Sequence, residues 1–177
     1  MSEKLKKEIF EWIKVFALAI VFAFIITQFI KPTLVRGDSM YSTLEEGDYL
    51  IINRMSYKFK EPERGDIIVF ESDLKQDDGS SKDLVKRVIG VGGDKVKIEN
   101  NKVYVNNEEL NEPYIHNEIT EGDIDTVVPD GAVFVLGDNR EISLDSRYDS
   151  VGFISKSDIL GKVFVRLYPF NKIGLLD

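Results

Sequence analysis

The sequence predicts a mainly β body, barrel-like or built from several small sheets, preceded by one N-terminal transmembrane helix. Residues 12–30 form one continuous apolar run, and no helical periodicity appears after it. Beyond Pro32 the chain changes to short runs rich in Val, Ile, Phe and Tyr, each bounded by turn residues. The 177 residues, 43% of them hydrophobic, can form one domain with a core of its own.

The apolar run "WIKVFALAIVFAFIITQFI" at residues 12–30 carries a single charge, on Lys14 near its beginning. As a helix it would reach about 28 Å, close to the roughly 30 Å hydrocarbon core of a bilayer. Trp12 stands where an interfacial aromatic residue is expected. A core helix apolar on every side is rare in a small soluble domain, and no Ala-x-Ala cleavage pattern follows the run. We therefore expect a retained membrane anchor.

The charges around this anchor give an expectation for its orientation. Four lysines precede or open the run, whereas Lys31 and Arg36 follow it. This distribution favours residues 1–11 in the cytoplasm, residues 12–30 across the plasma membrane, and residues 31–177 as an extracytoplasmic β-rich domain.

Six stretches of the body have the composition of strands, and they share β-branched and aromatic residues between turn residues. They are residues 48–54, 65–72, 84–91, 94–106, 131–138 and 159–168. Within 94–106, alternating residues flank Asn100 and Asn101, which predicts a two-residue hairpin turn. Residues 73–83 and 111–125 are polar and rich in turn residues, and we expect them to be loops.

Composition excludes several classes of function. The net charge is −8, and because the first 36 residues carry +3, the remaining 141 carry −11, which argues against nucleic acid as a partner. The absence of cysteine excludes a thiol nucleophile, an iron–sulfur centre and disulfides. Because His116 is the single histidine, sites that need two histidines are excluded, and we assign His116 no role. A carboxylate metal site is conceivable at residues 77–78 or 123–125, but both lack the alternation and closing Glu of a calcium loop, and solvated loop charge is favoured. We expect no metal and no cofactor.

A hydroxyl activated by a lysine remains as a route to hydrolysis. Lys86 lies within the apolar run "LVKRVIGV", and burial there can lower its pKa of about 10.4 by up to about 3–5 units. The alternative is an exposed lysine that protects an edge strand, and the pattern alone favours it. Ser39, in "RGDSMYSTL", is by itself a turn residue. The polar stretch at 136–153 adds weight, because a buried Asp–Arg pair with flanking hydroxyls can hold a base in place.

Four stretches, "GDSMYSTL", "RGDIIVF", "KRVIG" and "GDNREISLDSR", occur in the order found in a known family. Over roughly residues 10–168 the chain resembles type I signal peptidases, the membrane-bound serine peptidases that remove signal peptides from exported preproteins, in their compact Gram-positive-like form. The resemblance implies cleavage after Ala-x-Ala-type sites and contact with the lipid bilayer, without metal or cofactor. It assigns the following roles: Ser39 as nucleophile, with its backbone N–H in the oxyanion hole, Lys86 as general base, Ser143 as the hydroxyl that orients the lysine, Asp145 and Arg147 as a supporting ion pair, and Met40 and Tyr41 beside substrate and lipid.

Two positions depart from the family pattern. Ser42 stands where the family usually has proline, and Gly37 stands where some members carry a second oxyanion-hole serine. A second hypothesis therefore remains open, a catalytically weakened or inactive membrane-anchored β-domain that binds exported proteins. A self-cleaving regulator of the Ser–Lys type is a third, although such proteins lack this anchor. Adhesion through Arg-Gly-Asp is disfavoured, since both copies, at 36–38 and 64–66, lie inside peptidase-like motifs. The sequence makes no prediction of oligomeric state.

Overall fold

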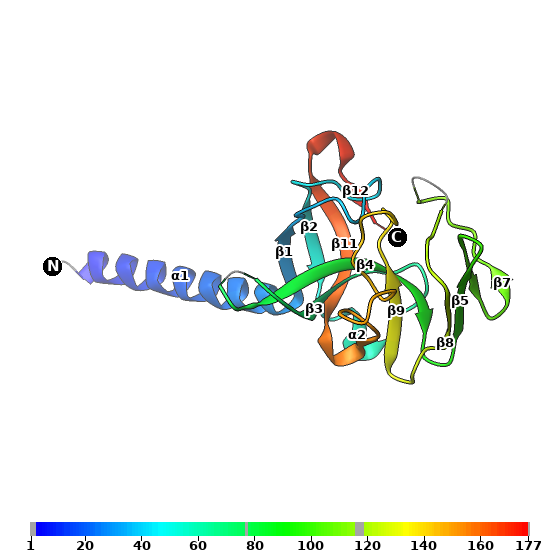
Figure 1. Cartoon of the computed structure of the whole chain (residues 1–177). Coiled ribbons are helices and arrows are strands. Elements are labelled where there is room, and N and C mark those ends of the chain that lie inside the picture. Colours follow the sequence, from blue (N-terminus) through cyan, green and yellow to red (C-terminus); the bar gives the residue numbers. More distant parts are fainter. Residues whose placement is uncertain (1–2, 77, 116–118, 177) are drawn as a thin grey trace.

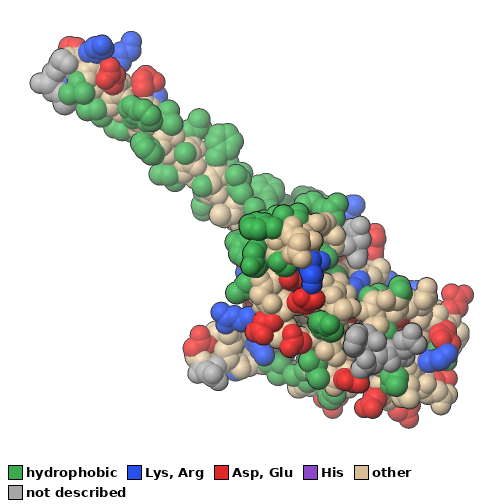
Figure 2. Space-filling view, turned by 90° about the horizontal axis from the view of Figure 1, so that it is seen from above, with side chains coloured by type: hydrophobic (Ala, Val, Ile, Leu, Met, Phe, Trp, Pro, Cys, Tyr) green, Lys and Arg blue, Asp and Glu red, His purple; other side chains and the backbone are tan. Residues whose placement is uncertain are grey.

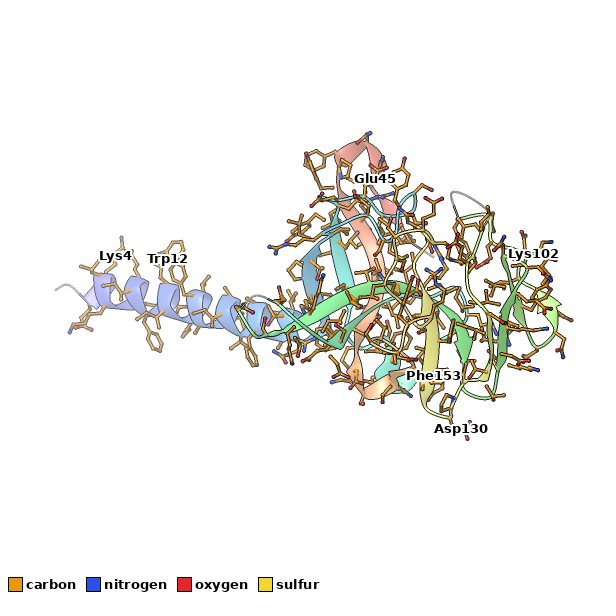
Figure 3. The ribbon with its side chains drawn as sticks, viewed as in Figure 1. Lys4, Trp12, Glu45, Lys102, Asp130 and Phe153 are labelled. Atoms are coloured by element: carbon orange, nitrogen blue, oxygen red, sulfur yellow. The ribbon has the colours of Figure 1, made fainter. Side chains whose placement is uncertain are left out.

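The computed structural model describes residues 3–76, 78–115 and 119–176. Helix α1 (Glu3–Phe29) projects as an isolated rod from one side of a β body (Figure 1). None of its residues is buried, and it is the one helix in the described ranges that is long and apolar enough to cross a membrane. Apolar side chains surround it in Figure 2, with charged side chains gathered at its N-terminal end. Lys4 and Trp12 stand out from the rod (Figure 3).

The helix boundaries differ from the expected 12–30. The helix includes Glu3 to Glu11 because these residues are good helix formers, and an i,i+3 ion pair places Lys6 Nζ 2.8 Å from Glu3 Oε1. It ends at Phe29, since Ile30 already begins strand β1 (Ile30–Leu34). The rod therefore leads into the body without a linker.

The main sheet is antiparallel, and two of its strands, β1 and β4, border the groove at the site. Its order is β1-β2-β11-β3-β4-β9-β10, with β12 added to β11. Their bounds are β2 (Tyr49–Asn53), β3 (Ile67–Lys75), β4 (Ser81–Val91), β9 (Ala132–Leu136), β10 (Ile154–Ser155), β11 (Ile159–Tyr168) and β12 (Gly174–Leu175). Short helices α2 (Ser56–Phe59), η1 (Lys156–Asp158) and η2 (Phe170–Lys172) join them.

A smaller sheet lies at the end of the body away from α1 (Figure 1), in the order β7-β6-β5-β8. It contains β5 (Lys95–Glu99), β6 (Lys102–Val105), β7 (Glu108–Glu109) and β8 (Ile124–Val127). The predicted hairpin turn is confirmed: Asn100 and Asn101 have φ of 52° and 65°, the left-handed backbone of a type I′ turn. Two sheets and one apolar helix confirm the predicted fold class.

The two expected loops differ in outcome. Residues 73–83 are mostly strand, because β3 and β4 continue past the core as a hairpin closed near Gly79, whose N–H donates to Gln76 O at 2.9 Å. The expected loop there is wrong over most of its length. Residues 111–125 are largely irregular, as expected, until β8 begins at Ile124. His116 and Asp77 lie outside the described residues.

Gly161 marks a bulge where β11 crosses from β3 to β2. A Cβ on it would lie 2.4 Å from Asn53 O and 2.8 Å from Ile52 Cγ2, so no side chain fits without displacing β2. We expect Gly161→Ala to lower the free energy of unfolding by about 1–3 kcal/mol, as overpacked core sites do. Thermal unfolding in detergent measures this. Gly174→Ala is the control, because nothing lies within 4 Å of that site; equal stability of both variants would contradict the prediction.

Candidate active site

Ser39 and Lys86 meet although 47 residues separate them in sequence: Lys86 Nζ donates a hydrogen bond to Ser39 Oγ at 2.6 Å. Ser39 lies in the turn that follows β1, where Gly37 has a φ of 78° that other residues rarely adopt. The next residue, Met40, is 2% exposed and packs in the core beside Leu44. Apolar burial on the C-terminal side thus holds the Ser39 hydroxyl in place.

Lys86 lies in the interior of β4 and is 2% exposed, so the alternative of an exposed edge-strand lysine is wrong. Among the described residues no carboxylate comes within 4 Å of its amine, in contrast to most lysines of the body. Desolvation by burial lowers the pKa of Lys86 from 10.5 to about 8, against the opposing charge of Asp145. A substantial fraction of the lysine is therefore neutral near pH 8 and able to accept a proton.

Asp145 and Arg147 form a buried ion pair beside this lysine. Arg147 Nε lies 2.8 Å from Asp145 Oδ1, and Asp145 Oδ2 accepts the Gly137 N–H at 3.0 Å. Arg147 also donates to the Arg140 carbonyl at 2.7 Å. The pair fastens the loop after β9, and Asn139 N donates to Ser39 O at 3.1 Å, which ties that loop to the serine.

The Ser143 hydroxyl is buried and has no hydrogen-bond partner among the described residues. It lies in the same loop, close to Ser39: a Cβ placed on Gly137 would be 2.2 Å from Ser143 Oγ and 2.4 Å from Ser39 O. Only glycine fits at position 137 between these two serines. The structure thus places Ser143 at the site without the expected hydrogen bond to Lys86.

A second buried ion pair was not predicted. Arg87 Nη2 lies 2.8 Å from Asp138 Oδ2, and both side chains are almost fully buried. Asp138 also accepts the Thr43 hydroxyl at 2.5 Å, and the Arg87 guanidinium stacks 3.9 Å from the Tyr114 ring centroid. Strand alternation sends Arg87 to the face opposite Lys86, and an arginine inside a strand buried on both faces requires a partner. The sequence therefore indicated that Arg87 needs an acidic partner, because Arg87 adjoins Lys86 within an apolar run.

The acidic stretch at 111–125 also reaches the site. Glu112 forms a buried ion pair with Arg140, and Arg140 donates to the Thr120 hydroxyl. Tyr114, in the same stretch, donates to Glu112 at 3.0 Å. Glu112, Tyr114 and Thr120 had no predicted role, because their partners lie about 20–30 residues away, at Arg140 and Arg87.

A groove of about 510 Å³ leads to Ser39. One wall is β1, which within the described residues pairs with β2 alone. The other wall is the first half of β4, which in the same part of the chain pairs with β3 alone. Exposed apolar side chains of Leu34, Ile142 and Leu144 line it. Two strand edges with unpaired backbone groups therefore border the groove. The lipid contact expected for Met40 is wrong, because Met40 is buried and lines the groove from the core, whereas Tyr41 is 37% exposed.

A serine hydroxyl bonded to a buried lysine of lowered pKa, beside an open groove, is the arrangement of a Ser–Lys hydrolase. Residues 9–168 match the family described as "Signal peptidase, peptidase S26", and the chain belongs to this family. In the described part of the chain, no group of three His, Asp or Glu side chains lies together in a way that could hold a metal ion.

Two named relatives align with nearly the whole chain. Signal peptidase IB of Staphylococcus aureus (strain COL) is 40% identical over 95% of this chain and 94% of its own. Signal peptidase I of Bacillus licheniformis is 36% identical over 99% and 97%. A crystal structure of a signal peptidase I from Enterococcus faecalis V583 is 33% identical, with a TM-score of 0.48, over 58% of this chain and 97% of that one. Together with α1, the family identifies a membrane-anchored serine peptidase.

The buried amine of Lys86 predicts how stability depends on pH. Its pKa of about 8 lies below the ordinary 10.5, so between these values the unfolded chain binds more protons and the free energy of unfolding rises with pH. Lys86→Met removes this titration. We expect it to be more stable than the native protein by up to ~3 kcal/mol below about pH 7, with no difference above about pH 10.5.

Chemical unfolding of both proteins in detergent across this pH range tests the prediction. Comparing the two proteins cancels the titration of groups that they share. A native protein as stable as Lys86→Met at every pH would show that the amine is not desolvated in the folded state.

Proposed function

We propose that this chain is a membrane-anchored serine endopeptidase that removes N-terminal signal peptides from exported preproteins, cleaving after Ala-x-Ala-type sites. The observation that carries the proposal is the 2.6 Å hydrogen bond between Ser39 Oγ and the buried amine of Lys86. The names of the relatives, signal peptidase I and IB, support the choice of substrate.

In the proposed mechanism, neutral Lys86 takes the proton of Ser39 as Oγ attacks the scissile carbonyl carbon. The negative charge then forms on the carbonyl oxygen, where the backbone N–H of Ser39 donates to it. Because Gly37 has no hydroxyl, backbone groups supply this stabilisation. The Lys86 ammonium protonates the departing amine, and Lys86 next activates the water that hydrolyses the acyl ester on Ser39.

The loop after β9 is proposed to keep the base oriented. Asp145 and Arg147 neutralise each other and hold the loop against Ser39. The Ser143 hydroxyl, buried and without a partner in the described structure, is available to accept a hydrogen bond from the ammonium that Lys86 becomes during catalysis. This assigns Ser143 an orienting role that begins when the lysine gains its proton.

The groove supports an extended peptide as substrate, because such a peptide can pair with the free edges of β1 and β4. Ser39 follows the end of α1 by ten residues. We propose that residues 1–11 are cytoplasmic and that residues 31–177 lie on the extracytoplasmic face of the plasma membrane. A signal peptide embedded beside α1 then presents its C-terminal end to the groove.

The alternative, a β-domain that binds exported proteins without cutting them, rests on Ser42 in the place of proline. With serine at that position, Ser39 and Lys86 still lie within hydrogen-bond distance. This geometry favours the active enzyme, and cleavage decides between the two.

We expect the purified protein in detergent to cleave a preprotein after an Ala-x-Ala sequence, with EDTA present. Ser39→Ala and Lys86→Ala are expected to lose at least about a thousandfold in kcat/KM, because each removes a group that takes part in bond formation. Ser157→Ala and Lys102→Ala, both at exposed positions, are the matched controls. A folded native protein that does not cut would support the binding domain.

The pH profile of cleavage gives a separate test of the base. Because only neutral Lys86 accepts the Ser39 proton, we expect kcat/KM to rise with pH through about 8 and then level off. A single inflection between about pH 6 and 7, typical of histidine, would contradict Lys86 as the base.

A further inference from the structure

Residues 54–60, "RMSYKFK", form a segment that we call the basic–aromatic segment. It carries three cations and no acid, within a body whose net charge is strongly negative. It begins where α1 ends: Arg54 N donates to Phe29 O at 2.9 Å, and Asn53 is the register partner of Ile30. The start of the segment is therefore fixed at the level where the apolar rod meets the body.

The charged side chains of this segment and the Phe59 ring are exposed to solvent, whereas Tyr57 packs against the core. Phe59 is 83% exposed, more than any other large hydrophobic side chain of the described chain. Arg54, Lys58 and Lys60 are exposed, and among the described residues none has a carboxylate within ion-pair distance. An aromatic ring between two lysines, left open to water, has no function in the packing of the body.

The neighbouring acids are largely occupied elsewhere. Glu61 pairs with Lys156, and Asp66 pairs with Lys162 at 2.6 Å and accepts the Tyr57 hydroxyl at 2.7 Å. Glu63 is the carboxylate of this neighbourhood without an ion pair in the described structure. The cations of the basic–aromatic segment thus keep a net positive charge that nothing in the described body neutralises.

We propose that the basic–aromatic segment binds the headgroups of anionic phospholipids. Arg54, Lys58 and Lys60 contact the phosphates, and the Phe59 ring enters the interfacial layer. The partner is a bilayer rather than a soluble anion, because the segment is fastened to the end of α1. The segment follows β2, on the edge of β1 opposite the groove, so this contact steadies the body without covering the path to Ser39.

The size of the effect follows from the charge. Each lysine or arginine near an anionic leaflet strengthens attachment about fivefold, so three give roughly a hundredfold at low salt. The attraction decays over about 10 Å at 0.1 M salt. It is independent of peptidase activity, because no residue of the segment belongs to the proposed catalytic machinery.

The test uses the full chain in bilayer nanodiscs. Since the protein has no cysteine, Ser56→Cys carries the one nitroxide label, whose exposure to aqueous and lipid-soluble relaxation agents reports depth. Replacing part of the phosphatidylcholine by phosphatidylglycerol is expected to move the label into the interface. In the Ser56→Cys background, Arg54→Gln, Lys58→Gln and Lys60→Gln together are expected to reduce the immersed-to-free ratio roughly a hundredfold.

The control combines Lys95→Gln, Lys97→Gln and Lys102→Gln, which removes the same charge from the sheet far from α1; Figure 3 marks Lys102 at that end. It is expected to leave the label immersed. Phe59→Ser is expected to reduce immersion in both lipid mixtures. Equal depth with and without phosphatidylglycerol would overturn the proposal, as would an equal loss in the control, which would indicate attraction by net charge alone. Cleavage in detergent checks that each variant is folded.

Discussion

The burial of the Lys86 amine is the constraint on which the rest of the site depends. Burial lowers the pKa of Lys86, whereas a nearby negative charge favours the protonated amine. Asp138 and Asp145 are two such charges, and both raise the pKa of Lys86. Each of these carboxylates has its own arginine, Arg87 and Arg147 respectively. The two buried ion pairs thus weaken the pull of both acids on Lys86 while fastening the loop that carries them.

The fold could be predicted from sequence where local chemistry decides it. Strands rich in β-branched and aromatic residues and the turn at Asn100-Asn101 are both determined by neighbouring residues. Both are found in the structure. The predicted loop at 73–83 was wrong because backbone pairing continues the β3–β4 hairpin after apolar burial has ended. The helix began earlier than expected because hydropathy reports the part that is apolar, whereas helix formation extends through charged residues as well.

The site was only partly predictable, because its parts are joined over long distances in sequence. Motifs indicated Ser39 and Lys86, but no local pattern states that Arg87 pairs with Asp138 or that Arg140 pairs with Glu112. The resemblance to the family implied that Met40 lies beside lipid; the turn after β1 instead directs this side chain into the core. Which face a turn residue presents is set by tertiary packing, which the sequence does not display.

Because α1 passes directly into β1 without a linker, the distance between the end of α1 and Ser39 is fixed. A flexible tether would let the serine sample many heights above the bilayer. Here the ten residues from Phe29 to Ser39 span at most about 35 Å, and the hydrogen bond from Arg54 to Phe29 clamps the start of that span. Ser39 is therefore held at one height. In the proposed membrane-anchored enzyme, the distance of Ser39 from the membrane surface therefore helps to select the cleavage position, together with the side chains of the substrate.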